Sequence, residues 1–316
     1  MLSYLENLTV RLAQAVAELP ADVIARHAKF LLAKQRPDGG FAGREGESDL
    51  YYSSFAIRSL AVLGELDGDV AKNAAGFLKQ RLTGQETIVD FLSLVYGAAL
   101  VEAASGIDVF ADAAPTWRDA VADALEELRR EDGGYAKGPD GARSSTYHTF
   151  LVILCLQLIE RPIKSPEKVI SFLNCQRSEG GGFREISASK RAGTNPTAAA
   201  IGTLKILDAL DEETRLDTID FLAEMQMSDG GLRANTRIPI ADLLSTFTAV
   251  LTLIDLDGIR EIDVPAARRF AESMQGANGG FNGAEWDDAF DVEYTFYGIG
   301  ALALLSSQQP GEQDFT

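Results

Sequence analysis

A pair of glycines followed by a bulky apolar residue occurs five times in this chain of 316 residues. The second glycines stand at positions 40, 134, 182, 231 and 280, so the steps between them are 94, 48, 49 and 49 residues. The first step is close to twice the others, which indicates one further repeat that lacks the pair. A constant period of this length is typical of repeat architectures. The five motifs are Gly39-Gly40-Phe41, Gly133-Gly134-Tyr135, Gly181-Gly182-Phe183, Gly230-Gly231-Leu232 and Gly279-Gly280-Phe281.

Each repeat predicts two helices of different character. The helix before the glycines ends in glutamine, as in Phe30 to Gln35, and carries charge on one face, which is typical of an outer, solvated helix. The helix after them, such as Thr197 to Leu210, is apolar nearly all round, as expected of a helix packed on both sides. We expect the glycines to end the first helix with a positive φ angle. In the repeat without a pair, Phe77 to Gln80 and a lone Gly84 precede a second helix over about Phe91 to Ala103.

Six such helix pairs predict an all-α fold, an α/α toroid in which an inner and an outer ring of helices close on themselves. Closure removes the need for polar capping repeats, and the last repeat is as apolar as the middle ones. Since no linker rich in proline, glycine or serine interrupts the array, we expect a single domain over residues 1–316. The predicted repeats span residues 22–68, 70–108, 115–160, 166–210, 213–258 and 264–306.

The composition bounds the partners and the compartment. A formal net charge of −18 argues against a nucleic-acid partner, since phosphate binding needs a basic surface. Cys155 and Cys175 lie in apolar helical sequence, which favours buried, reduced thiols. The N-terminus lacks the features of a signal peptide, and no apolar run approaches the roughly 18–20 residues that a membrane span needs. We therefore expect a cytoplasmic protein without a membrane span.

The repeat, a Phe-Leu-containing helix ending in glutamine, then Gly-Gly-Phe and an apolar helix, resembles that of protein prenyltransferase β subunits. The resemblance runs from about His27 to Leu305 and is strongest toward the geranylgeranyl-transferring type over Asp291 to Ile299. It implies the α/α toroid that terpene cyclases share, with a central cavity for an isoprenoid chain. The partners implied are an isoprenoid diphosphate or polyene, and a helical α-type subunit or a second copy of the chain.

The zinc site that this resemblance implies is incomplete. The family's Asp, Cys and His ligands fall on Asp242, Leu244 and Tyr294, and a leucine cannot bind a metal. We therefore expect no zinc and no resident cofactor. Asp242, Asp291 and Glu293, at the starts of adjacent inner helices, could instead form an all-oxygen site that suits Mg²⁺. The alternative for Asp242 and Asp291 is that they cap their helices.

A basic cluster in the loops of repeats four and five stands out in so acidic a chain. Beside the N-termini of inner helices, such a cluster could bind a diphosphate. The resemblance assigns this role to Arg233 and Arg237, while the family's diphosphate-binding His and Tyr fall on Gly193 and Ser245. The alternative is a solvated loop that pairs with surface carboxylates. The candidate diphosphate ligands are Arg184, Lys190, Arg191, Arg233 and Arg237.

Four residues are candidates for catalysis: Asp242, Glu293, Asp291 and His148. Asp242 and Glu293 could form a carboxylate pair near the reacting carbon. Glu293 also falls where class II terpene cyclases carry their acid, by the same resemblance. His148 opens an inner helix and could act as acid, base or ligand, or could simply hydrogen-bond within the core. Aromatic residues at inner-helix starts could line the cavity, namely Tyr52, Tyr147, Phe247, Tyr294 and Tyr297.

Three functions stay open on this evidence. The first is binding of an isoprenoid diphosphate in an apolar cavity, with prenyl transfer that does not use the Asp/Cys/His zinc site. The second is an inactive toroid that serves as a binding scaffold, which the loss of the Cys and His donors favours. The third is cyclisation of class II type with Glu293 as the acid.

Overall fold

The computed structural model describes residues 2–81 and 87–308. Within these ranges the chain forms α-helices joined by loops, with isolated β-bridges in place of strands. The lone Gly84 of the second repeat lies outside the described residues. An N-terminal helix, α1 (Tyr4–Val16), precedes six helix pairs. The first helices of the pairs are α2 (Ala21–Leu32), α4 (Gly68–Gln80), α6 (Trp117–Glu126), α8 (Pro166–Gln176), α10 (Glu212–Ala223) and α12 (Val264–Ser273).

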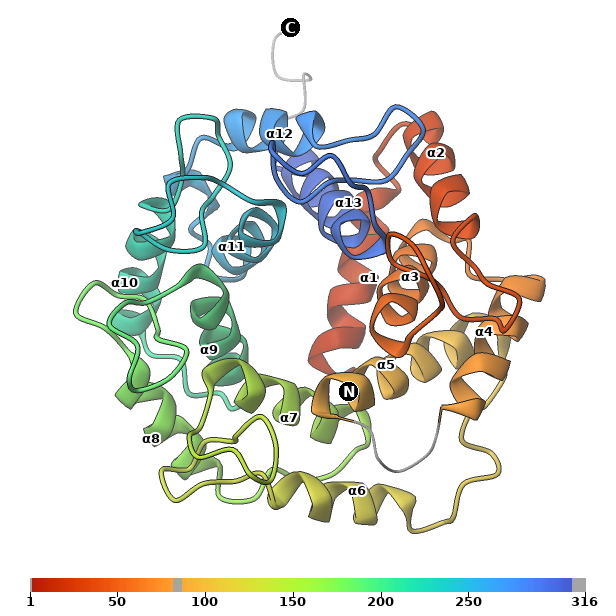
Figure 1. Ribbon diagram of the computed structural model, residues 1–316. Coiled ribbons are helices and arrows are strands. Elements are labelled where there is room, and N and C mark those ends of the chain that lie inside the picture. The colour runs from red at the N-terminus through yellow and green to blue at the C-terminus, as the bar shows by residue number, and fades with distance from the viewer. Residues whose placement is uncertain (1, 82–86, 309–316) are drawn as a thin grey trace, which may run out of the picture.

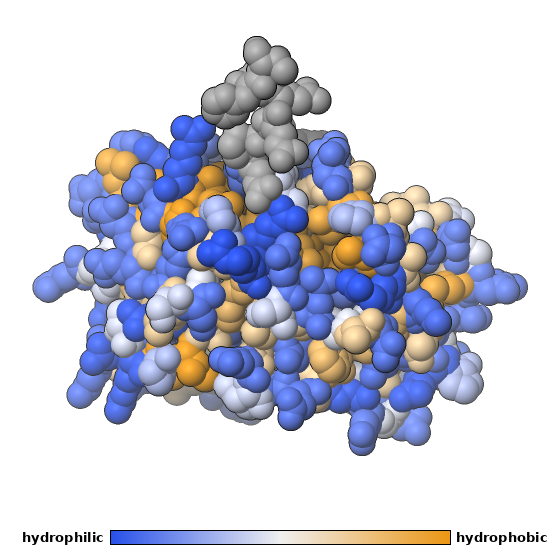
Figure 2. Space-filling model, turned by 90° about the horizontal axis from the view of Figure 1, so that it is seen from above, coloured by the Kyte–Doolittle hydropathy of each residue, from blue (hydrophilic) through white to orange (hydrophobic). Residues whose placement is uncertain are grey.

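The second helices of the pairs form the inner ring, and the first helices surround them (Figure 1). This arrangement confirms the predicted α/α toroid. Figure 2 views the ring edge-on, where mostly polar side chains cover the outer helices. The apolar second helices lie between this outer ring and the centre, which explains why they are buried on nearly every face. They are α3 (Leu50–Leu63), α5 (Ile88–Ser105), α7 (Thr146–Leu158), α9 (Thr194–Ile206), α11 (Leu243–Asp255), after which comes the short 3₁₀ turn η1 (Ile259–Glu261), and α13 (Val292–Ser306).

The glycines do not end the outer helices, contrary to the prediction. Helix α2 ends at Leu32, whereas Gly39, with the expected positive φ of 91°, lies several residues later. There the Gly39 N–H donates to the Arg36 carbonyl at 2.9 Å, and Gln35 and Phe41 pair across the turn. The left-handed residue therefore closes a tight turn that leads the chain inward, rather than the last turn of the helix.

The same glycines pack each repeat against the next outer helix. A Cβ atom on Gly133 would lie 2.3 Å from the carbonyl oxygen of Lys168 in α8, and one on Gly134 would lie 2.8 Å from the Phe172 ring. Both distances are too short for a side chain, so only glycine allows this approach. Equivalent contacts join Gly39 to α4, Gly181 to α10 and Gly230 to α12.

The last glycine pair closes the ring against the first repeat. A Cβ on Gly279 would lie 2.4 Å from the Arg26 carbonyl oxygen in α2. Beside it, the buried His27 accepts a hydrogen bond at Nδ1 from the Gly280 N–H, at 3.1 Å. Its Nε2 lies 3.1 Å from the Gln275 side-chain oxygen, so Nε2 must carry the proton of a neutral ring.

A second contact closes the ring at the loop end. Arg44, in the loop of the first repeat, donates from Nε to Asp291 at 3.0 Å and also pairs with Asp287. Both carboxylates belong to the sixth repeat and are far less exposed than the arginine. The two ends of the array are thus held together by packing, hydrogen bonds and charge.

Helix α1, which the sequence analysis did not predict, crosses the end of the ring where the inner helices terminate. Thr9 hydrogen-bonds with Tyr96 of α5, and Arg11 pairs with Asp255 at the end of α11. Leu12 of α1 is fully buried against the ring. Part of this end of the ring is therefore covered by a helix that belongs to none of the repeats and packs against α3, α7 and α13 (Figure 1).

Two composition-based expectations need correction. Helix α5 is long and apolar enough, by length and composition, to cross a membrane. It nevertheless packs as an inner helix between α3 and α7, and its apolar length reflects burial on both sides. Cys155 is buried as expected, but Cys175 is exposed on the solvent face of α8. An apolar sequence neighbourhood did not distinguish the two faces of that amphipathic helix.

The turn glycines yield a stability prediction. Gly133→Ala should lower the free energy of unfolding by about 2 kcal/mol or more, because alanine meets both a positive φ of 92° and the Lys168 carbonyl. Gly76→Ala is the matched control, since a Cβ there, within α4, meets no atom within 4 Å. That change should stabilise by roughly 0.5–1 kcal/mol. Urea unfolding measures both, and equal effects would contradict the packing role.

His27 yields a pH prediction. Burial lowers its pKa to about 4 from 6.5, so between these values the unfolded chain binds more protons. The stability that His27 contributes is complete above pH 6.5 and is lost as the pH falls toward 4. The stability advantage of wild type over His27→Gln should therefore shrink by about 2 kcal/mol between pH 7.5 and pH 5. A constant difference in urea unfolding would refute this.

Candidate functional site

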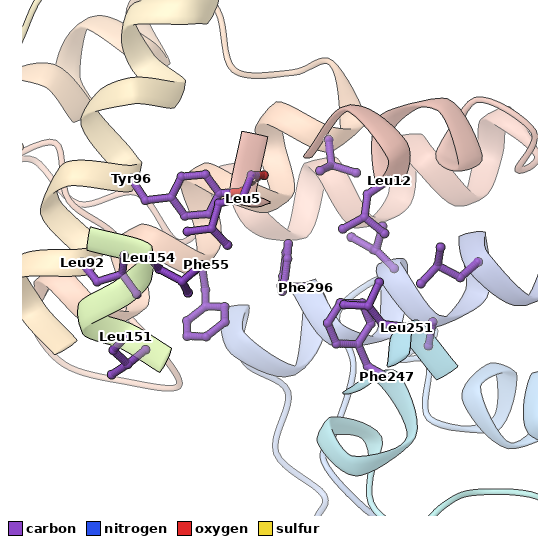
Figure 3. Close-up of a cluster of buried hydrophobic side chains, with 14 of the residues drawn as sticks. Leu5, Leu12, Phe55, Leu92, Tyr96, Leu151, Leu154, Phe247, Leu251 and Phe296 are labelled. Atoms are coloured by element: carbon purple, nitrogen blue, oxygen red, sulfur yellow. Dashed lines mark hydrogen bonds between the residues drawn. The ribbon is translucent and has the colours of Figure 1, made fainter. Parts of the chain in front are cut away.

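A cavity of about 470 Å³ lies at the centre of the ring. All six inner helices contribute to its wall, and Tyr4, Leu5 and Leu8 of α1 form its floor. The opposite end carries first-turn residues of inner helices, such as Tyr147, whose 41% exposure marks the open mouth. Figure 3 shows the apolar side chains that gather here from different helices. The site is thus a pocket with α1 at one end and the first turns of the inner helices at the other.

Aromatic rings form much of one side of the wall. Phe55 lies 5.1 Å from Tyr51, 5.8 Å from Phe296 and 5.4 Å from Tyr297, measured between ring centroids. Phe247 of α11 adds a ring 5.7 Å from Phe296. These residues follow the helical period, so the inner helices turn one face of their first turns to the cavity.

The same period separates the predicted cavity residues into two groups. Tyr147, Phe247 and Tyr297 lie on the wall, whereas Tyr52 and Tyr294 do not. Each of the latter is one position away from a wall residue and is therefore rotated out of the cavity. Their rings instead cover the loop glycines of their own repeats, at positions 43 and 283, where a Cβ would lie within 2.7 Å and 2.5 Å of the ring.

Glu293 is the one candidate catalytic residue among the wall residues described. Its Oε1 accepts a hydrogen bond from the Tyr51 hydroxyl at 2.7 Å, and the Tyr297 hydroxyl lies 3.5 Å away. Burial is the main cause that raises its pKa, and nearby Asp291 raises it further. A carboxyl in this position can hold a proton against an apolar space, as a general acid must.

Asp242 and Asp291 act as helix caps. Asp242 accepts from the Ser245 N–H at 2.7 Å and from the Ser245 hydroxyl at 2.8 Å. Asp291 accepts from the Tyr294 N–H at 2.9 Å and also pairs with the arginine of the first loop. Such bonds satisfy the free N–H groups of a helix start. The geometry therefore matches the capping alternative for both residues.

The predicted pairing of Asp242 with Glu293 is not found. Asp242 lines a separate, smaller pocket of about 140 Å³, together with Trp286 and Tyr294. Leu244, by contrast, lies on the wall of the central cavity. The three positions that correspond to the family's zinc ligands thus face two different spaces. Across the described residues, no group of three or more His, Cys, Asp or Glu side chains converges as a metal site.

His148 also lies off the cavity wall. Its Nδ1 is 2.8 Å from the Ser145 hydroxyl, and Ser145 in turn bonds to the Glu185 carboxylate. Burial lowers the pKa of His148, and the nearby Lys137 lowers it further, so the neutral ring is favoured. This histidine supports the start of α7, as the core alternative proposed.

The basic side chains of these loops do not reach the cavity wall. Arg184 donates to the Cys175 carbonyl at 2.5 Å, and Arg233 donates to the Glu224 carbonyl at 3.4 Å, so both bind the ends of their own outer helices. Such carbonyls are the free acceptors of a helix end, which an arginine can satisfy. Arg191 bonds to Thr236 in the next loop. None of the five candidates, including the exposed Lys190 and Arg237, belongs to the cavity wall.

Two charged wall residues were missed as site residues. Arg58 projects from α3, and Glu185 reaches the wall from the loop of repeat four. Burial raises the pKa of Glu185, which accepts a hydrogen bond from Ser145. Arg58 had a sequence signal, because it is the one charged residue in the apolar stretch from Leu50 to Leu63. Glu185 had none, because it lies among basic residues in a polar loop.

Comparison with known proteins gives one family and several similar folds. A family model described as the prenyltransferase alpha-alpha toroid domain matches residues 9–166 and 162–316. No curated protein matches this chain. Among solved structures, the Candida albicans protein geranylgeranyltransferase-I complexed with GGPP is 14% identical, with a TM-score of 0.73. The match covers 90% of this chain and 92% of that one.

A second group of similar structures comes from the type II terpene cyclase MstE of Scytonema. Its apo structure is 15% identical, with a TM-score of 0.62 over 93% of this chain and 98% of that chain. A variant in complex with geranylgeranyl dihydroxybenzoate is 14% identical, with a TM-score of 0.61 over 96% and 99%. At such identities these likenesses show a shared fold.

Proposed function

Because this chain belongs to the prenyltransferase α/α-toroid family, we propose that its central cavity binds an isoprenoid chain. The observation that carries the proposal is the pocket itself, which aliphatic and aromatic side chains line, including Leu5 and Leu8 of α1 at one end. Its volume of about 470 Å³ falls within the roughly 300–1,000 Å³ typical of pockets for small organic ligands. A flexible, unsaturated hydrocarbon would bury most of its surface there.

The fold comparisons support the length of such a chain. The geranylgeranyltransferase-I structure contains GGPP, and the terpene cyclase variant contains a geranylgeranyl dihydroxybenzoate. Both compounds carry a geranylgeranyl group on different polar heads. We therefore favour a geranylgeranyl-type chain as the ligand of this cavity, independent of the reaction.

Transfer of a prenyl group from a diphosphate has less support than binding of an isoprenoid without transfer. Transfer needs cations that stabilise the departing diphosphate, but the basic loop residues lie off the wall and Arg58 is the one cationic side chain on its described part. Two carboxyl groups, those of Glu185 and Glu293, also line the cavity. These wall residues therefore favour a protein that binds the isoprenoid without zinc-dependent transfer.

A second candidate function is cyclisation started by Glu293. Its carboxyl proton would pass to a terminal alkene carbon, so that an O–H bond breaks, a C–H bond forms and a carbocation remains. Loss of a proton elsewhere on the chain would end the reaction. Phe55, Phe247 and Phe296 present π faces that stabilise positive charge. The buried, protonatable carboxyl beside these rings favours this candidate over an inert scaffold.

Filling the cavity tests the binding proposal. Leu8→Trp should weaken the binding of geranylgeraniol at least about tenfold, because the larger ring occupies space on the cavity floor. Val10→Trp is the control on the same helix, since Val10 is 46% exposed and lies outside the wall. Equilibrium binding of radiolabelled geranylgeraniol measures both. Failure of wild type to bind, or equal affinity of the two variants, would contradict the proposal.

Product analysis tests the cyclase candidate. Wild type is incubated with geranylgeraniol and with geranylgeranyl diphosphate, and mass spectrometry identifies cyclic isomers of unchanged mass. Glu293→Gln keeps the hydrogen-bonding shape but cannot donate the proton, so product formation should fall at least about 100-fold while binding persists. Equal product from the variant would exclude Glu293 as the acid, and release of diphosphate would support prenyl transfer.

A further inference from the structure

Arg58 is the one cationic side chain on the described wall of the cavity. It lies seven residues after Tyr51 on α3, so its Cα is about 10 Å deeper than the mouth. Arg58 is partly buried, and removing a charge from water is costly unless a partner compensates for it. The position therefore calls for an explanation that core packing does not give.

The structure supplies only part of that compensation. The guanidinium carbon lies 4.9 Å from the centre of the Phe55 ring and 4.7 Å from that of Tyr96. These cation–π contacts hold the planar group between two rings. No carboxylate pairs with Arg58 among the described residues, and its Nε is buried without a hydrogen-bond partner. The Nε–H donor is thus held in place without a partner in the protein.

The two wall carboxyl groups have other partners. Glu293 accepts from the Tyr51 hydroxyl, and Glu185 accepts from Ser145. Burial raises the pKa of each, which favours their neutral forms. Neither carboxyl forms an ion pair with Arg58 within the described part of the chain, so a positive charge stays open to the cavity.

Two hydroxyl groups lie within range of that charge. The charge on Arg58 lowers the pKa of the Tyr147 and Tyr297 hydroxyls, opposing burial, which raises both. Both side chains line the same cavity. A fixed guanidinium with neighbouring hydroxyls can bind an oxyanion by charge-assisted hydrogen bonds.

We propose that Arg58 recognises an oxyanion, a carboxylate or a phosphate, on the isoprenoid ligand of this cavity. The inference rests on the proposed function and extends it, because it states what group the hydrocarbon must carry. It also assigns anion binding to the cavity wall, in place of the loops that the basic cluster suggested. A planar guanidinium suits the two oxygens of either group.

The test compares one chain with three head groups at pH 7.5. Geranylgeranoic acid or geranylgeranyl phosphate should bind wild type at least about tenfold more tightly than geranylgeraniol, which carries no charge. If neither anion binds more tightly than the alcohol, the inference is wrong and the proposed function stands. If none of the three binds, both are wrong. The anion whose affinity exceeds that of the alcohol by the larger factor identifies the preferred head group.

Variants then assign the preference to the residue. Arg58→Gln should bring the anions and the alcohol to similar affinity, whatever its effect on the affinity for the alcohol itself. Arg269→Gln, which removes the same charge from the exposed side of α12, should keep the wild-type preference. Circular dichroism verifies that each variant is folded. A preference that survives Arg58→Gln would overturn the assignment, and the wild-type comparison holds even if that variant fails to fold.

Discussion

The contact on which this structure depends is the approach of a turn glycine to the backbone of the next outer helix. A carbonyl oxygen of that helix occupies the space where a Cβ would stand, as for Gly133 against Lys168. The glycine supplies the positive φ and the absent side chain at once. Because the sixth repeat makes the same contact with the first, through Gly279 and Arg26, a local turn motif also determines that the array closes.

Closure alone gives a ring open at both ends, and a pocket needs a floor. Helix α1 provides it, with Leu5 and Leu8 turned to the cavity and Arg11 held by Asp255. The repeat pattern could not predict this helix, because α1 belongs to no repeat and has no glycine pair. An ordinary amphipathic helix at the N-terminus therefore converts a closed ring into a binding pocket.

The periodic glycines made the fold, the pairing of helices and their inner and outer positions predictable. The wall of the site was only partly predictable, because a shift of one residue rotates a helical side chain by about 100°. Glu293 lies on the wall and its neighbour Tyr294 does not. Asp242 and Asp291 show another limit of prediction from sequence. A carboxylate at a helix start can be a helix cap or a catalytic group, and only its hydrogen-bond partners distinguish the two roles.

The roles of the charged residues were the least predictable, because the role of a charged group depends on what it contacts. Arg184 and Arg233 form part of a notable cluster in the sequence, yet they bond to the ends of outer helices. Arg58 is the one charged residue in an apolar helix, and this isolation indicates a functional position. A single charge in such a helix must contact a partner, solvent or a ligand. Among the described residues it has two aromatic rings and no anion. Glu293, a carboxyl whose pKa is raised by burial, lies close to the mouth of the pocket, and the unpaired Arg58 lies deeper along α3. One end of a bound isoprenoid would therefore contact a carboxyl group and the other a guanidinium.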